Sequence, residues 1–123
     1  MKTGRKISGG KYHKARKKRK HEKDRQPRIV VLGKERKKQI RTRGGKIKTC
    51  LLSTDIAYIL NKKTGKCEKL KIKNVVETPA NKFFARQNVL MKSSVIDTDK
   101  GKARITNRPS QEGCVNAVFI EEK

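Results

Sequence analysis

The chain has 123 residues, of which 35 are lysine or arginine and 11 are aspartate or glutamate, so its formal net charge at pH 7 is +24. No apolar run approaches the roughly 18 residues of a membrane-spanning helix, and the N-terminus lacks the apolar stretch of a signal peptide. These features argue against a membrane protein, and we expect a cytosolic protein with at most one folded domain and a polyanionic partner.

Most of the positive charge lies in the first 48 residues, which contain 21 lysines and arginines, three acidic residues and ten apolar residues. Such a segment cannot bury enough apolar surface to offset the entropy of ordering, so we expect it to stay disordered until a polyanion neutralises it. Residues 49–123 have a composition typical of folded domains. We therefore predict a basic nucleic-acid-binding extension over residues 1–45 and a β-rich core domain over residues 46–123.

The basic extension changes character along its length. Three glycines among four cations in residues 1–11 predict an extended, adaptable chain. Residues 12–23 are mostly good helix formers, but their like charges repel at helical spacing, so we expect a helix only in the bound state. After Pro27, the apolar residues 29–33 predict a strand or an anchor onto the domain.

The most informative short motif is formed by Arg41, Arg43, Gly44 and Gly45. Arginine can make bidentate hydrogen bonds to a phosphate or stack on an exposed base. The glycine pair lets the backbone turn sharply or approach an anion closely. The plainer interpretation is a basic turn that leads into a strand, but we favour contact with a nucleic acid.

From Lys46 onward, the pattern is mostly that of β-strands. Leu70, Ile72 and Val75 alternate with lysines near period two, which gives one apolar and one solvated face. A loop over residues 61–66 predicts a hairpin of 56–60 with 67–76, and a loop over 97–102 predicts a hairpin of 95–96 with 103–106. Residues 109–113 predict a turn into a last strand over 114–120.

One segment departs from the β pattern. Thr78 as N-cap and Pro79 as first helical residue predict a short helix over residues 80–87. About six short strands would leave exposed edges unless the sheet closes, and we expect Phe83 or Phe84 to plug the closed sheet. The predicted fold is therefore mainly β, a small β-barrel-like domain with one short helix, preceded by an extended basic N-terminal arm.

The cysteines, aspartates and histidines of the chain do not form a sequence pattern that predicts a catalytic or metal site. Cys50, Cys67 and Cys114 are widely spaced with no neighbouring histidine, which predicts reduced core residues and not zinc ligands. Asp97 and Asp99 flank a glycine-containing turn, where aspartate is common because of its local hydrogen bonds. Both histidines lie in the basic extension. We expect no enzyme activity, metal, cofactor or small-molecule substrate.

Five motifs in the same order resemble one protein family. They are SGG at residues 8–10, ARKKRK at 15–20, IRTRGG at 40–45, GKARITNRP at 101–109 and GCVNAV at 113–118. Together they resemble the archaeal and eukaryotic family of ribosomal protein eight of the small subunit, which is unrelated to the bacterial protein of that number. The short length is similar to the archaeal form, since eukaryotic members contain an insertion.

The resemblance implies a structural constituent of the small ribosomal subunit with a role in translation and subunit assembly. Its expected partners are small-subunit ribosomal RNA and neighbouring ribosomal proteins, and its expected location is the cytoplasm, in ribosomes. Charge alone leaves two alternatives open, a ribosome-biogenesis factor with a related domain and a DNA-compacting chromosomal protein.

The candidate RNA-binding residues are of two kinds. Cations and glycines are expected to contact phosphates with release of counterions, and Tyr12 and His13 to stack on an unpaired base. The full set is Lys2, Arg5, Lys6, Lys11, Tyr12, His13, Lys14, Arg16, Lys17, Lys18, Arg19, Lys20, Arg25, Arg28, Arg36, Lys37, Arg41, Arg43, Gly44, Gly45, Lys46 and Lys48.

Overall fold

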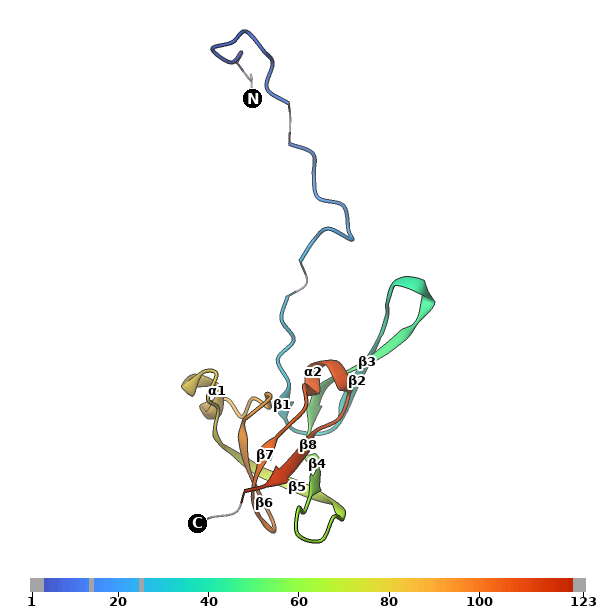
Figure 1. The fold of residues 1–123 in the computed structure, drawn as a ribbon, viewed down its shortest axis with the longest axis vertical. Helices are drawn as coiled ribbons and strands as arrows, with labels where there is room; N and C mark the ends of the chain where they lie inside the picture. Colours follow the sequence, from blue (N-terminus) through green and yellow to red (C-terminus); the bar gives the residue numbers. More distant parts are fainter. Residues whose placement is uncertain (1–3, 14, 25, 121–123) are drawn as a thin grey trace.

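Strands dominate the computed structural model, which describes residues 4–13, 15–24 and 26–120 (Figure 1). In chain order, the elements are β1 (Val31–Leu32), β2 (Arg36–Arg41), η1 (Arg43–Gly45), β3 (Ile47–Thr54), β4 (Ile56–Leu60), β5 (Cys67–Glu77), α1 (Lys82–Arg86), β6 (Val95–Thr98), β7 (Gly101–Ile105), α2 (Pro109–Glu112) and β8 (Asn116–Phe119). Strands β4 to β8 form a closed barrel, and β1 to β3 form a three-stranded sheet. The predicted fold class is confirmed.

The barrel is built from the two predicted hairpins and a closing strand. β4 pairs with β5, and β6 pairs with β7, both antiparallel. In the second hairpin Thr98 lies opposite Gly101, so the connection is tighter than the loop predicted over residues 97–102. Parallel pairing of β4 with β8 closes the barrel and removes the exposed edges.

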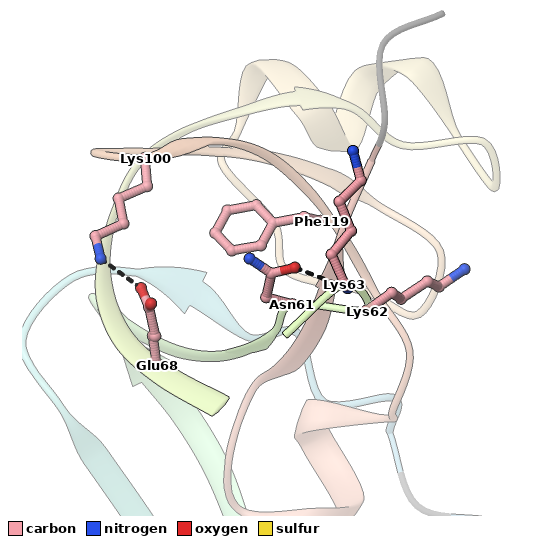
Figure 2. Close-up of a pocket in the computed structure, with 6 residues that line it drawn as sticks. All are labelled: Asn61, Lys62, Lys63, Glu68, Lys100 and Phe119. Carbon is pink, nitrogen blue, oxygen red and sulfur yellow. Dashed lines mark hydrogen bonds and ion pairs between the residues drawn. The ribbon is translucent and has the colours of Figure 1, made fainter. Parts of the chain in front are cut away.

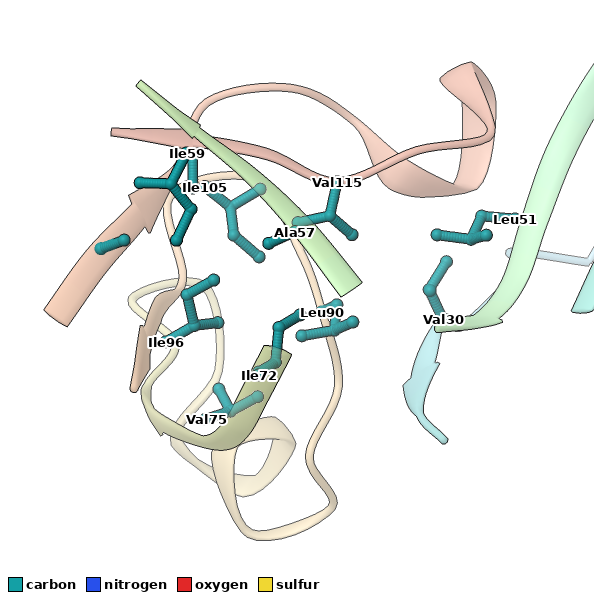
Figure 3. Close-up of a cluster of buried hydrophobic side chains, with 12 residues drawn as sticks. Val30, Leu51, Ala57, Ile59, Ile72, Val75, Leu90, Ile96, Ile105 and Val115 are labelled. Atoms are coloured by element: carbon teal, nitrogen blue, oxygen red, sulfur yellow. The ribbon is translucent and has the colours of Figure 1, made fainter. Parts of the chain in front are cut away.

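Apolar side chains from every barrel strand fill the interior (Figure 3). Ile59, Ile96 and Ile105 are at most 1% exposed, and complete burial of such a side chain contributes about 1.5–3 kcal/mol. Ile72 and Val75 are both buried although they are three positions apart, because the pairing of β5 with β6 shifts register between them. The bulge therefore keeps the apolar face of β5 inside after the period-two pattern breaks.

The aromatic residue that packs against the barrel core is Phe119, which corrects the prediction for Phe83 or Phe84. Phe83 lies on α1 and is 67% exposed, and Phe84 is half-buried outside the core cluster. Phe119 is partly buried and packs against that cluster. It follows Ala117 by two residues on β8, so both side chains lie on the inward face of the strand.

The short helix begins later than predicted. Asn81 is the N-cap of α1, and its side-chain oxygen accepts a hydrogen bond from the backbone N–H of Phe83 at 3.0 Å. Thr78, predicted as the cap, is buried, and its hydroxyl accepts a hydrogen bond from Ser94 at 3.2 Å. The turn predicted over residues 109–113 is the second short helix, α2, with Pro109 in its first turn.

The segment over residues 29–33 is both a strand and an anchor, as predicted. β1 runs parallel to the end of β3. On its other side, Leu32 donates a backbone hydrogen bond to Asn88 at 3.0 Å, and Leu90 donates one to Val30 at 2.8 Å. Val30 is 1% exposed and belongs to the core cluster. The base of the arm is therefore fixed to the domain.

A hairpin formed by β2 and β3 was not predicted. β2 consists of residues 36–41 and pairs antiparallel with β3, and the intervening turn contains η1. Five of the six residues of β2 are exposed, so the strand has no alternation of apolar and polar residues that would predict it. The boundary proposed between residues 45 and 46 falls in the hairpin turn.

The three cysteines have free thiols but different environments. Cys50 is buried, as predicted, whereas Cys114 is half-buried and Cys67 is exposed. The prediction is therefore wrong for Cys67, which is the first residue of β5 at the edge of the barrel. In the described part of the chain, no helix is long and apolar enough to cross a membrane.

Candidate nucleic-acid interface

The arm extends away from the barrel (Figure 1), and its described residues before Arg28 are exposed except Glu22, which is half-buried. Near the start, Lys6 and Gly10 form a local turn in which the N–H of Lys6 donates to the carbonyl of Gly10 at 2.9 Å. The ammonium group of Lys6 lies 5.7 Å from the centre of the Tyr12 ring, a cation–π contact. Tyr12 remains 53% exposed, so its ring is available for a base.

The carboxylate of Glu22 organises the most basic part of the arm. Arg16 makes two hydrogen bonds of 2.7 Å to the carboxylate of Glu22, which also accepts one from the backbone N–H of Arg19 at 2.9 Å. These hydrogen bonds favour the ionised carboxylate, so the pKa of Glu22 is lowered and the pKa of Arg16 is raised. The described residues between 12 and 23 form no helix in this unbound chain, so the helix expected on binding stays a prediction.

The predicted contact residues fall into three groups, and Lys2, Lys14 and Arg25 lie outside the described residues. The arm contains Arg5, Lys6, Lys11, Tyr12, His13, Arg16, Lys17, Lys18, Arg19 and Lys20, and its base contains Arg28. The β2–β3 hairpin contains Arg36, Lys37, Arg41, Arg43, Gly44, Gly45, Lys46 and Lys48. The structure therefore places on one hairpin six residues predicted in the extension over residues 1–45 and two, Lys46 and Lys48, predicted in the core domain.

The tip of the hairpin exposes three of these cations. Arg41, Arg43 and Lys46 surround the turn, and each is exposed. Gly44 and Gly45 have φ angles of 78° and 77°, in the left-handed region that other residues rarely adopt. The sharp turn predicted for the glycine pair is observed. It lies at the tip of the β2–β3 hairpin, which extends away from the barrel (Figure 1).

The base of the arm and the hairpin share a groove. A cavity of about 510 Å³ includes Arg28 and Lys48 in its lining. Arg28 donates a hydrogen bond to the Cys50 sulfur at 3.4 Å, and Lys48 donates one to Gln111 on α2 at 3.2 Å. An adjoining cavity of about 360 Å³ adds Arg108, which the sequence analysis omitted although its family motif contains it.

Acidic residues neutralise little of this charge. Among the described residues of the arm and hairpin, the only ion pairs of lysines and arginines join Arg16 to Glu22 and Lys37 to Glu35. The hydrogen bond to Glu35 raises the pKa of Lys37. In the part of the chain that the structure describes, no group of three His, Cys, Asp or Glu residues is placed to hold a metal ion. The arrangement is suited to binding a polyanion.

Comparison with known proteins gives the family. Residues 1–120 match the family described as Ribosomal protein S8e. The chain belongs to this family. It is 43% identical to small ribosomal subunit protein eS8 of Methanocorpusculum labreanum, over 98% of this chain and 96% of the relative. It is 44% identical to the eS8 protein of Methanosarcina barkeri, over 95% of this chain and 94% of the relative.

Family membership confirms several predictions. The resemblance to the archaeal form is confirmed by archaeal relatives that match nearly the whole chain. The chain is a structural constituent of the small ribosomal subunit. Because the family consists of structural ribosomal proteins, the prediction that the chain is not an enzyme is also confirmed.

Proposed function

We propose that this chain binds and stabilises small-subunit ribosomal RNA through its basic arm and its β2–β3 hairpin. The observation that supports this most directly is the exposed positive charge of these two elements, which leave the barrel on the same side (Figure 1). Two ion pairs leave most of that charge uncompensated within the described residues. Because the chain belongs to a family of small-subunit ribosomal proteins, we infer that the polyanion is ribosomal RNA.

The binding mechanism follows from the chemistry of the two elements. In the basic extension over residues 1–45, the lysines and arginines that contact a phosphate neutralise it and release counterions, which contributes affinity but little sequence information. Arg41 and Arg43 add bidentate hydrogen bonds at the hairpin tip. Tyr12 and His13 supply rings for an unpaired base. The core domain over residues 46–123 docks on folded RNA and holds the base of the arm through Val30.

The ordering of the arm gives the protein its role in assembly. Described arm residues make few contacts with the barrel, so the arm adopts a defined path only when phosphates surround it. It then links RNA helices that repel one another when their charge is not neutralised. We place the protein in cytoplasmic ribosomes, next to neighbouring ribosomal proteins, where this link supports subunit assembly and translation.

A salt titration tests this proposal. If about eight phosphates are contacted, a plot of log K against log salt should have a slope near −6, with about 0.7 per contact. The assay is filter binding of the full chain to small-subunit ribosomal RNA, and a flat titration would refute the proposal. Subunits washed in moderate salt should retain the protein. Loss before subunit maturation would indicate a biogenesis factor, and co-purification with DNA would indicate a chromosomal protein.

A further inference from the structure

The barrel has a second basic surface at the end remote from the arm. The β4–β5 loop and the β6–β7 turn lie at this end (Figure 1). They border a pocket of about 390 Å³, and none of the candidate RNA-binding residues lines this pocket. The residues that line it are Asn61, Lys62, Lys63, Glu68, Lys100 and Phe119 (Figure 2). We call these residues the barrel-end pocket.

An aromatic ring lies between two hollows at this end. Phe119 faces the barrel-end pocket (Figure 2) and also lines an adjacent hollow of about 440 Å³. One side of Phe119 packs against the buried core, which holds the ring in place. The residue is only partly buried, so the ring combines rigid support with an open face. Supported rings of this kind are platforms on which unpaired bases stack.

Two cations border the same ring. Lys62 lines both hollows, and Arg104 lines the second. Both side chains are exposed. Among the described residues, the one carboxylate that lines either hollow belongs to Glu68, and Lys100 neutralises it through an ion pair of 2.6 Å. The described residues that line the two hollows therefore carry a net positive charge.

The loop that presents Lys62 is already ordered. The side-chain oxygen of Asn61 accepts a hydrogen bond from the backbone N–H of Lys63 at 3.0 Å (Figure 2). The backbone N–H of Asn61 donates to the carbonyl of Lys66 at 3.0 Å, and Gly65 donates to the carbonyl of Asn61 at 2.9 Å. Ligand binding therefore requires little further ordering of the loop backbone.

We infer that the barrel-end pocket is a second RNA contact, in which an unpaired base stacks on Phe119 while Lys62 and Arg104 bind the flanking phosphates. A single-stranded nucleotide has a flat π-face with an anionic group on either side, which matches a ring with cations beside it. The inference rests on the proposed function and extends it. RNA held at both ends of the barrel would make this protein a bridge between two RNA segments.

Ultraviolet crosslinking of the unmutated chain to small-subunit ribosomal RNA tests the inference without any substitution. We expect a crosslinked peptide that contains Phe119. In intact subunits, a crosslink of Phe119 to a neighbouring protein in place of RNA would overturn the inference.

Substitutions at the ring separate stacking from packing. Phe119→Leu keeps an apolar side chain against the core and removes the ring, so the affinity for the RNA should fall at least about fivefold. Phe119→Tyr keeps the ring and should bind like the wild type. Equal affinity of Phe119→Leu and the wild type would contradict the inference, and thermal denaturation of both variants shows that the barrel is folded.

Two double variants test whether the positive charges of Lys62 and Arg104 contribute to RNA binding. Lys62→Gln with Arg104→Gln should reduce the magnitude of the salt slope by about 1.4. Lys69→Gln with Lys71→Gln removes the same charge from exposed positions on β5 that line neither hollow, and should change the slope less. Equal effects of the two double variants would overturn the inference. Salt-dependent binding that Phe119→Leu leaves unchanged would reject only this inference, whereas salt-independent binding of the wild type would reject the proposed function.

Discussion

Removal of the two arginines at the hairpin tip tests the proposed interface most directly. In the structure, Arg41 and Arg43 are exposed and form no ion pair among the described residues, so each is free to release counterions on binding RNA. With about 0.7–0.9 counterions per contact, the Arg41→Gln/Arg43→Gln variant should bind with a salt slope smaller by about 1.4–1.8. At 0.1 M salt this corresponds to a loss of about 25- to 60-fold in affinity.

Two controls make this prediction specific. Arg41→Lys/Arg43→Lys keeps both charges but loses the bidentate geometry, so the slope should stay unchanged while the affinity falls by a smaller factor. The second control is Lys69→Gln/Lys71→Gln, which removes two exposed positive charges elsewhere and so measures the effect of lower net charge alone. The assay is filter binding to small-subunit ribosomal RNA at several salt concentrations. An unaltered slope for Arg41→Gln/Arg43→Gln would refute the placement of RNA at the hairpin tip.

Three further predictions concern stability and pH. Gly113→Ala should destabilise the fold by at least about 1–2 kcal/mol in thermal denaturation, because Gly113 has a φ of 75° and a Cβ there would lie 3.1 Å from a Thr49 carbon; an unchanged Tm would contradict this. Ile96→Ala should cost about 2–5 kcal/mol because Ile96 is fully buried in the barrel, and chemical denaturation measures it. The Arg16–Glu22 pair should persist at pH 4.5, the ordinary carboxyl pKa, and break at lower pH because the pKa of Glu22 is lowered; NMR titration of Glu22 that gives a pKa of 4.5 or above would disprove it.

The barrel hairpins were predictable because their signals are local. The alternation of Leu70 and Ile72 with lysines, and the glycine-containing loops, specify strands and turns through neighbouring residues alone. Closure of the barrel depends on β8 lying parallel to β4, about 60 residues earlier in the chain. No short-range pattern specifies such a pairing.

The helix start and the barrel plug show how burial overrides local preference. Thr78-Pro79 is a good helix start, but burial of Thr78 and its hydrogen bond with Ser94 keep it outside α1, and Asn81 caps the helix instead. Adjacent phenylalanines suggested a plug, yet α1 contacts the outside of the barrel wall at β5 and leaves Phe83 exposed. Phe119 occupies the position at the barrel end because it lies on the inward face of β8.

The candidate interface was predictable in composition but not in shape. Charge clustering identified the cations of the arm, and the glycine pair predicted the turn at Gly44 and Gly45. β2 was not predicted, because a strand whose side chains face solvent has no apolar periodicity in its sequence.

Composition and local pattern by themselves determined the concentration of positive charge in the first 48 residues, the β class and the two barrel hairpins, because each depends on residue types or close neighbours. Only the tertiary structure decided that residues 36–41 belong to a hairpin, that β4 closes on β8, and that Phe119 lies beside Lys62 and Arg104 at the far end of the barrel. These features arise from backbone pairing and packing between distant segments, whose free energy depends on which surfaces become buried together.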